Sequence, residues 1–358
     1  MRYTAVMFIT LLSFAPVFSA SAAARSSAAG RILLQTESRG EAWYVPAAST
    51  ERTYLANGTA AYDVMRAYGL GMTNTDLKKI PAGLISDLNV ADTDSDGLPD
   101  NLEEALGTDM LKADSDEDGY SDGDEVSAGY NPLGLGKSST SAVFTKRFLG
   151  RILLQVQGKG QAWFVNPADG KRYYMSNGEA AYQIMKKFGL SARNSLVKSF
   201  VISNRTVSCG FDKECFVRSA ENAQPALVNW ESNVDMMGMF ITSVSEKTVS
   251  KGFSSYVFSE RTTQTRYSMT DAQRAEARSK GLTDALIDKQ LSDAEATTPD
   301  ASSLVTTCQY QDPLALTKVL RKWENGNFHV LASVNVVTGK TTLKGDYEDI
   351  GECVIAKE

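Results

Sequence analysis

Residues 150–200 contain three short apolar runs separated by turn-forming residues, followed by a change in the spacing of the apolar positions. Arg151–Val156 and Ala162–Val165 flank a Gly-Lys-Gly turn, and an Asp-Gly turn precedes Arg172–Met175. This pattern predicts a three-stranded meander. A helix ending at Gly189 is predicted next by apolar residues at helical intervals, namely Ala181, Ile184, Met185 and Phe188.

The same pattern occurs 120 residues earlier, so the chain contains an internal repeat. Residues 30–80 align with residues 150–200 without a gap, and 23 of the 51 positions are identical. Both copies begin with the string GRILLQ, at Gly30–Gln35 and Gly150–Gln155. We therefore predict two copies of one module, each a β-meander plus a helix. The modules resemble segments of uncharacterised exported bacterial proteins, and that resemblance implies no activity.

The modules are rich in aromatic residues, which have two interpretations. They form the core and cross-strand pairs of a small module, or they form a platform on which sugar rings stack. We favour the core. Adjacent strand positions face opposite sides of a sheet, so one of Trp163 and Phe164 is a candidate for exposure. The residues concerned are Trp43, Tyr44, Tyr54, Trp163, Phe164, Tyr173 and Tyr174.

Between the two copies lies a strongly acidic strip, which carries the clearest candidate chemistry. Residues 87–125 contain fifteen Asp and Glu against one Lys, so the net charge of −6 combines −14 here with +8 elsewhere. Residues 92–103 read DTDSDGLPDNLE and fit the calcium-loop pattern D-x-[DN]-x-[DN]-G-x5-E. The predicted ligands are Asp92, Asp94, Asp96, the Leu98 carbonyl, Asp100 and Glu103.

Residues 114–125, DSDEDGYSDGDE, repeat the pattern after 22 residues. The predicted ligands are Asp114, Asp116, Asp118, the Tyr120 carbonyl, Asp122 and Glu125. Hard oxygen ligands at this spacing suit Ca²⁺, and the alternative, an acidic disordered linker, does not account for two complete matches. We also predict a small apolar spine between the loops, formed by Leu98, Leu102, Leu106, Leu111 and Tyr120.

The residues after each loop, Gly107-Thr108-Asp109 and Gly129-Tyr130-Asn131-Pro132, indicate the type of loop. A spacing of 22 residues leaves no room for the flanking helices of an EF-hand. Residues 87–134 resemble bacterial thrombospondin type 3 repeats. That resemblance implies a spacer stiffened by Ca²⁺, with extra ions held by residues such as Asp109. We therefore expect calcium to hold the two modules at a set distance.

The chain begins with Arg2, an apolar run from Val6 to Phe18 and small residues that offer A-x-A cleavage sites. Residues 1–24 are predicted to be a secretory signal peptide, the alternative being a membrane anchor. No later apolar stretch approaches the length of a membrane span. We expect a mature chain that is secreted, periplasmic or held at the cell surface, with residues 135–147 as a linker.

Four cysteines lie in the last third of the chain: Cys209, Cys215, Cys308 and Cys353. An even count in one region of an exported protein predicts two disulfides. Three pairings are possible, and we favour Cys209–Cys215 with Cys308–Cys353.

Residues 201–358 predict an α+β domain. A β-rich stretch from Val228 to Ser268 is broken by Lys251-Gly252, and Thr270 begins a helix with a capping box. Further helices are expected at Thr283–Asp293 and Asp312–Trp323, and a hairpin at Phe328–Asp346. The whole chain is thus a multidomain α+β protein: two small modules flanking a loop-rich calcium segment, then a disulfide-bearing domain.

Motifs for catalysis are lacking in the sequence. Its single histidine, His329, lies in an apolar run, and we find no G-x-S-x-G, H-E-x-x-H or P-loop motif. We predict a non-enzymatic binding or structural protein, whose partners are calcium and either a cell-wall glycan or another surface protein, and not nucleic acid. The alternative is a wall hydrolase that uses a carboxylate pair, with candidates Glu231, Asp235 and Glu260.

Overall fold

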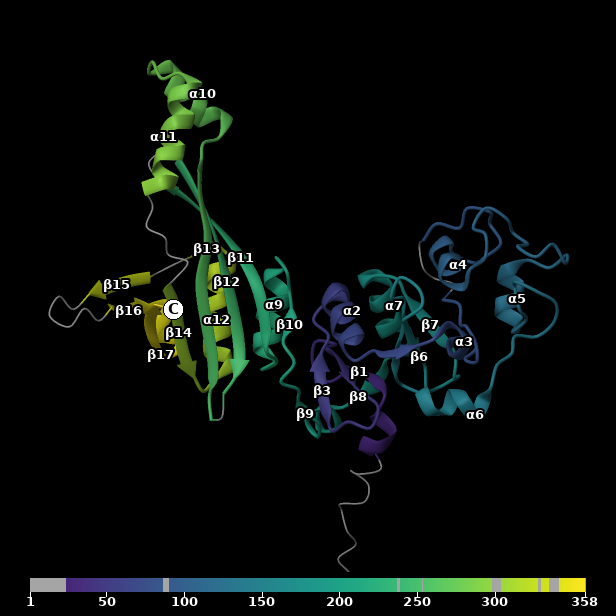
Figure 1. Ribbon diagram of the computed structural model, residues 1–358. Coiled ribbons are helices and arrows are strands. Elements are labelled where there is room, and N and C mark those ends of the chain that lie inside the picture. The colour runs from purple at the N-terminus through teal and green to yellow at the C-terminus, as the bar shows by residue number, and fades with distance from the viewer. Residues whose placement is uncertain are drawn as a thin grey trace, which may run out of the picture.

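A computed structural model describes residues 24–85, 90–236, 239–252, 254–297, 304–327, 330–334 and 341–357. The predicted signal peptide, except for Ala24, and His329 lie outside these residues. Figure 1 shows three regions: the two repeat copies in the centre, the acidic segment with helices α4 and α5 at one end, and a long-stranded C-terminal domain at the other. In the described residues, no helix is long and apolar enough to cross a bilayer.

Each repeat copy is a three-stranded antiparallel meander followed by a helix, as the apolar pattern predicts. The first copy comprises β1 (Arg31–Gln35), β2 (Ala42–Val45), β3 (Glu51–Tyr54) and α2 (Gly58–Ala67). The second comprises β5 (Ile152–Gln155), β6 (Ala162–Val165), β7 (Arg172–Met175) and α7 (Gly178–Phe188). Both helices begin in the same way, because Asn57 and Asn177 each accept a hydrogen bond from the backbone N–H three residues ahead.

The two copies exchange a strand. After α2 the chain forms β4 (Leu70–Met72), which pairs in parallel with β5 of the second copy. After α7 it forms β8 (Leu190–Ala192), which pairs in parallel with β1 of the first copy. The sheets therefore have the orders β8-β1-β2-β3-β9 and β4-β5-β6-β7, where β9 is Val201–Ile202. Each sheet is completed by a strand from the other copy.

A short helix follows each exchanged strand and also contacts the other copy. These are α3 (Asn74–Leu77) and α8 (Asn194–Lys198). The guanidinium of Arg52 stacks on Trp43 at 4.5 Å and donates to the carbonyls of Val197, at 2.5 Å, and Phe200 at the end of α8.

Arg172 repeats this arrangement in the second copy. Its guanidinium stacks on Trp163 at 4.9 Å and donates to the carbonyls of Leu77, at 3.0 Å, and Ile80 after α3. Each arginine therefore binds the helix end that the other copy contributes.

Glycines allow the two copies to approach closely. A Cβ atom on Gly58 would lie 2.4 Å from the carbonyl oxygen of Gly178, and one on Gly150 would lie 2.4 Å from the Cα of Gly30. The repeated Asn-Gly and Gly-Arg strings thus place glycine where the two backbones touch. This packing corrects our expectation that the acidic segment holds two modules apart, because the copies are in direct contact and share their sheets.

The aromatic residues of both copies form core, as we favoured, and they do not form the alternative sugar-stacking platform. Six of the seven are buried, and Tyr174 is partly buried. Trp163 and Phe164 do face opposite sides of their sheet, yet both are covered. Phe164 belongs to the main hydrophobic core, whereas Trp163 lies in a second cluster that includes residues of the acidic segment.

The C-terminal domain is built on a six-stranded sheet of order β10-β11-β12-β13-β14-β17. Its strands are β10 (Val207–Ser208), β11 (Ala226–Met236), β12 (Met239–Lys251), β13 (Tyr256–Ser268), β14 (Leu304–Tyr310) and β17 (Glu352–Lys357). Helices α9 (Lys213–Glu221) and α12 (Pro313–Glu324) pack on it through Phe216, Leu320 and Trp323. The predicted hairpin is β15 (Val330–Val334) with β16 (Thr341–Gly345), followed by α13 (Asp346–Ile350).

Two further helices, α10 (Asp271–Ser279) and α11 (Asp284–Thr297), stand beyond the ends of the long strands (Figure 1). The predicted capping box of α10 is present, formed by Thr270 and Gln273. At the opposite end the domain meets the first repeat copy, where the backbone N–H of Tyr54 donates to Gln224 at 3.0 Å.

Both favoured disulfides are present. Cys209–Cys215 closes the turn before α9, and Cys308–Cys353 joins β14 to β17. The described residues include no free cysteine.

Candidate metal centre

The two acidic loops each lead into a short helix, α4 (Asp100–Leu106) and α5 (Asp122–Ala128). Gly97 and Gly119, at the sixth position of each loop, have φ values of 91° and 100°. Glycine adopts this left-handed conformation without strain, so the chain can reverse direction there and bring the preceding carboxylates together. The region between the two repeat copies therefore presents two similar acidic cages.

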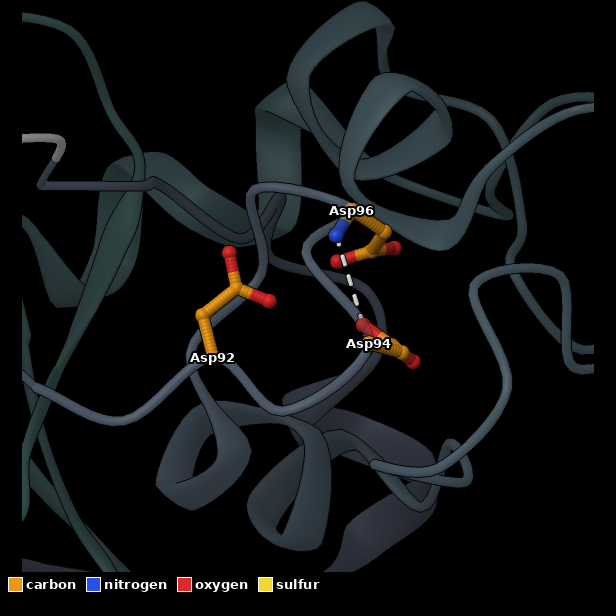
Figure 2. A group of neighbouring side chains, drawn as sticks. All are labelled: Asp92, Asp94 and Asp96. Carbon is orange, nitrogen blue, oxygen red and sulfur yellow. Dashed lines mark hydrogen bonds between the residues drawn. The ribbon is translucent and has the colours of Figure 1, made fainter.

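In the first loop, Asp92, Asp94 and Asp96 converge, with carboxylate oxygens within 4.8 Å of one another (Figure 2). Backbone N–H groups hold them in place. Gly97 donates to Asp92 at 3.0 Å, Asp96 donates to Asp94 at 3.3 Å, and Leu98 donates to Asp96 at 2.7 Å. The side chains are thus oriented before any ion binds.

The second loop repeats this arrangement. Asp114, Asp116 and Asp118 bring their carboxylate oxygens within the same 4.8 Å. Gly119 donates to Asp114 at 2.8 Å, and Tyr120 donates to Asp118 at 3.1 Å. The six aspartates predicted at the first, third and fifth loop positions are therefore brought together as two triads.

The glutamates at the last position, Glu103 and Glu125, are both buried. Burial, reinforced by repulsion from Asp94 and Asp96, raises the pKa of Glu103 to about 7. Burial and the neighbouring aspartates of the second loop likewise raise the pKa of Glu125 to about 7. A buried carboxylate in this setting is stabilised by a cation.

Five buried carboxylate oxygens of the predicted ligands have no hydrogen-bond partner. They belong to Asp92, Asp94 and Glu103 in the first loop and to Asp116 and Glu125 in the second. Buried polar atoms are nearly always paired, so orphaned oxygens clustered in both loops indicate a missing partner. A divalent cation with several oxygen ligands, such as Ca²⁺, fits both cages.

The aspartates at the ninth loop position, Asp100 and Asp122, accept hydrogen bonds from residues of their own loops. Asp100 accepts hydrogen bonds from the backbone N–H and the hydroxyl of Thr93, both at 2.7 Å. Asp122 accepts from the N–H and the hydroxyl of Ser115, at 3.1 and 2.5 Å. The structure therefore assigns these two carboxylates to closing the loops. The sequence signal for this role is the hydroxyl residue at the second position of each loop, Thr93 and Ser115, which the calcium-loop pattern leaves unspecified.

The two loops are linked to each other. The backbone N–H of Gly123, in the first turn of α5, donates to Asp96 at 2.7 Å, so an oxygen of one loop's triad is held by the other loop's helix. A Cβ on Gly123 would lie 2.3 Å from the carbonyl oxygen of Asp96. Only glycine leaves room for this approach, and sequence reasoning did not identify that role.

The acidic segment also packs against the repeat copies. Leu98, Leu102 and Val126 lie in one buried cluster with Trp163 and Leu77. The predicted apolar spine between the loops is therefore wrong in part, because only some of its residues are buried.

Leu98 and Leu102 are buried against the second repeat copy, while Leu111 and Tyr120 are each 68% exposed. The first loop covers apolar surface of the two repeat copies, whereas the side chains of the second loop at these positions face solvent.

The candidates for carboxylate catalysis, Glu231, Asp235 and Glu260, lie in the C-terminal domain. The side chain of Glu260 is partly buried, paired with Lys247, and accepts from the Tyr347 hydroxyl at 2.6 Å. Glu231 is exposed and accepts from Asn233. The side chain of Asp235 lies outside the described residues.

A family model matches the acidic segment at residues 92–113 and 114–133, with the description bacterial TSP3 repeat. The segment is a tandem pair of bacterial TSP3 repeats. These TSP3 repeats begin at Asp92 and Asp114, the first predicted ligand of each loop. None of the curated proteins and none of the solved structures compared with the chain gives a significant match.

Proposed function

We propose that this chain is an exported, non-enzymatic calcium-binding protein, in which Ca²⁺ fixes the TSP3 segment on the body formed by the two repeat copies. The observation that carries the proposal is the set of five orphaned carboxylate oxygens in the two loops. Three aspartates, the carbonyl at the seventh position and both oxygens of the glutamate would give each loop six oxygen ligands, which suits Ca²⁺ because it accepts six to eight. Neutralising part of the −14 charge would allow the segment to remain folded.

The position of the segment supports a role for calcium in docking rather than in spacing. The repeat copies touch through exchanged strands, so their separation does not depend on the insertion between them. An ion can instead fix the conformation of the loops. Because Leu98 and Leu102 share a buried cluster with Trp163, the ion can in this way stabilise the contact between the segment and the second repeat copy. Calcium would therefore control the surface that the segment presents.

Export is supported by one prediction from the sequence and one observation of the structure. The predicted signal peptide at residues 1–24 would direct the chain out of the cytoplasm, and two disulfides persist in oxidising compartments. Extracellular calcium modules bind with Kd of about 10⁻⁴–10⁻³ M, and we expect roughly 10⁻⁴ M or tighter here because each loop gathers five carboxylates. We propose a secreted, periplasmic or surface-held chain that binds a partner there.

The test is calorimetric titration of calcium into a double variant, Glu103→Gln with Glu125→Gln. Each substitution removes one buried charge and replaces one of the two carboxylate oxygens with an NH₂ group, which cannot bind the ion, so most binding should be lost. The matched control is Glu104→Gln with Asp124→Asn, which removes the same charge from exposed neighbours. Unchanged binding in the first variant would overturn the assignment, and equal loss in the control would attribute binding to overall charge.

A further inference from the structure

A groove of about 330 Å³ lies between the TSP3 segment and the repeat copies. One wall comes from residues between 129 and 140, which follow the second loop, and the other from Lys78 and residues 80–82 and 171–172 of the body. Its lining includes Ile80 and Val126, which are buried. The groove therefore exists only while the segment is docked on the body.

The charge of the groove is opposite to that of the loops beside it. Lys78 and Lys171 on the body and Lys137 on the segment line it, and its described lining contains no Asp or Glu. The ammonium of Lys137 lies 5.9 Å from the ring centre of Tyr130. A basic groove next to a segment of charge −14 is a local concentration of positive charge that attracts an anionic group.

The rim of the groove is apolar. Leu135 is 87% exposed, and Leu133 and Tyr130 are each 42% exposed. Three large apolar side chains at the edge of one groove would gain from being covered. A ligand that satisfies both features carries carboxylates and apolar side chains, as an acidic peptide does. A polyanionic glycan would pair with the lysines but offer no side chain to the leucines.

The segment wall depends on the second calcium loop. Tyr130 N–H donates to the carbonyl of Glu125 at 2.7 Å, so the wall begins one turn after the last predicted ligand. The wall is closed on itself, because Asn131 N–H donates to the Gly136 carbonyl at 2.9 Å. It returns to the body where Ser141 N–H donates to the Lys79 carbonyl at 2.8 Å. Ordering of Glu125 by an ion would therefore position Tyr130 and the residues after it.

We infer that this groove is a calcium-dependent docking site for an acidic peptide segment of a partner protein. The lysines pair with the partner's carboxylates, and Tyr130, Leu133 and Leu135 cover its apolar side chains. This inference rests on the proposed calcium function, since the ion sets one wall.

The test uses the full chain and a fluorescein-labelled short peptide of alternating Asp and Leu, followed by fluorescence anisotropy at saturating calcium. The peptide should bind, and the triple variant Lys78→Glu, Lys137→Glu, Lys171→Glu should bind it about tenfold or more weakly. The matched control places the same charge change on exposed lysines that do not line the groove, Lys186→Glu, Lys198→Glu and Lys318→Glu, and should bind as the parent does. Leu135→Ser should weaken binding by up to about tenfold.

Further measurements test the site, the class of partner and the calcium dependence separately. Calcium titration of the triple groove variant should be unchanged, so that loss of peptide binding with normal calcium binding supports the groove. Equal binding of the peptide by the triple variant and the parent overturns the site, and preference for polygalacturonate over the peptide overturns the partner class. Peptide binding that persists in chelator overturns the calcium dependence. If the parent itself binds no calcium, the proposed function fails and the calcium dependence of the groove is overturned with it.

Discussion

The two calcium loops have the same ligand pattern but different surroundings. In the first loop, the side chains at the seventh and eleventh positions are Leu98 and Leu102, which are buried against the second repeat copy. In the second loop the same positions hold Tyr120 and Asp124, which are exposed. The comparison shows that the ligand residues determine the geometry of the metal site. The side chains at the seventh and eleventh positions determine whether the loop packs against the repeat copies.

The residues at the tenth loop position also have different partners in the two loops. Gly123 of the second loop donates to Asp96 of the first, whereas its counterpart Asn101 donates to Ser176 of the second repeat copy at 3.1 Å. The first loop thus contacts the body, and the second contacts the first. Disturbance of the first loop should therefore affect both sites, while disturbance of the second loop's own exposed positions should remain local.

The largest difference is expected between Leu98→Ala and Tyr120→Ala. Both keep the backbone carbonyl at the seventh position, so neither removes a calcium ligand. Truncating the buried leucine should cost about 2–5 kcal/mol in the stability of the docked segment. Truncating the exposed tyrosine should cost within about 0.5 kcal/mol. Hydrogen exchange of the segment's amides at saturating calcium measures both, and equal protection in the two variants would contradict the anchoring of the first loop.

Gly123→Ala tests the contact between the loops. Alanine favours a helix, but its Cβ would lie 2.3 Å from the Asp96 carbonyl oxygen, so the loops must separate. We expect a net destabilisation of about 1–3 kcal/mol and weaker calcium binding at the first loop. Ser127→Ala, at an exposed position of the same helix, is the control and should change neither. Calorimetry that finds both variants alike would remove the link between the sites.

The response to pH should be shared by both loops, because the pKa of Glu103 and that of Glu125 are each raised to about 7. A raised carboxyl pKa means that the calcium-free fold is favoured by protonation, with stability falling from about pH 4.5 to about pH 7. Calcium requires the charged form, so its affinity moves in the opposite direction. At pH 6 we expect each site to bind roughly tenfold more weakly than at pH 8. Calorimetry in two buffers of different ionisation enthalpy should show proton release near pH 7, and no release would contradict these pKa shifts.

The smallest effects are expected where the loops are alike. Thr93→Val and Ser115→Ala each remove a hydroxyl that donates to the Asp at the ninth position. Each should weaken the closing of its loop by about 0.5–1.5 kcal/mol, measured as a shift in the calcium affinity of that site. A much larger loss in one loop would show that its ninth-position carboxylate also contacts the ion.

Several features could be predicted from the sequence because they depend on short-range spacing. The calcium loops place three aspartates, a glycine and a glutamate within twelve residues, so local geometry brings the aspartates together. The meander and helix of each copy follow from alternating and helical apolar periods. In contrast, β14 and β17 were not predicted as strands of one sheet, although the favoured pairing of Cys308 with Cys353 joined them.

The sequence by itself determined the repeat, the two TSP3 loops and the candidate ligands, because each is written in residues close together along the chain. Only the tertiary structure decided that the copies exchange β4 and β8. Leu70–Met72 and Leu190–Ala192 are three-residue strands with no period of their own, and each copy begins with the same GRILLQ string. Local pattern therefore could not tell which copy's first strand each would join. The choice depends on contacts between residues more than 80 positions apart, such as Arg172 with the Leu77 carbonyl and Gly58 with Gly178, where packing of the whole body selects one pairing.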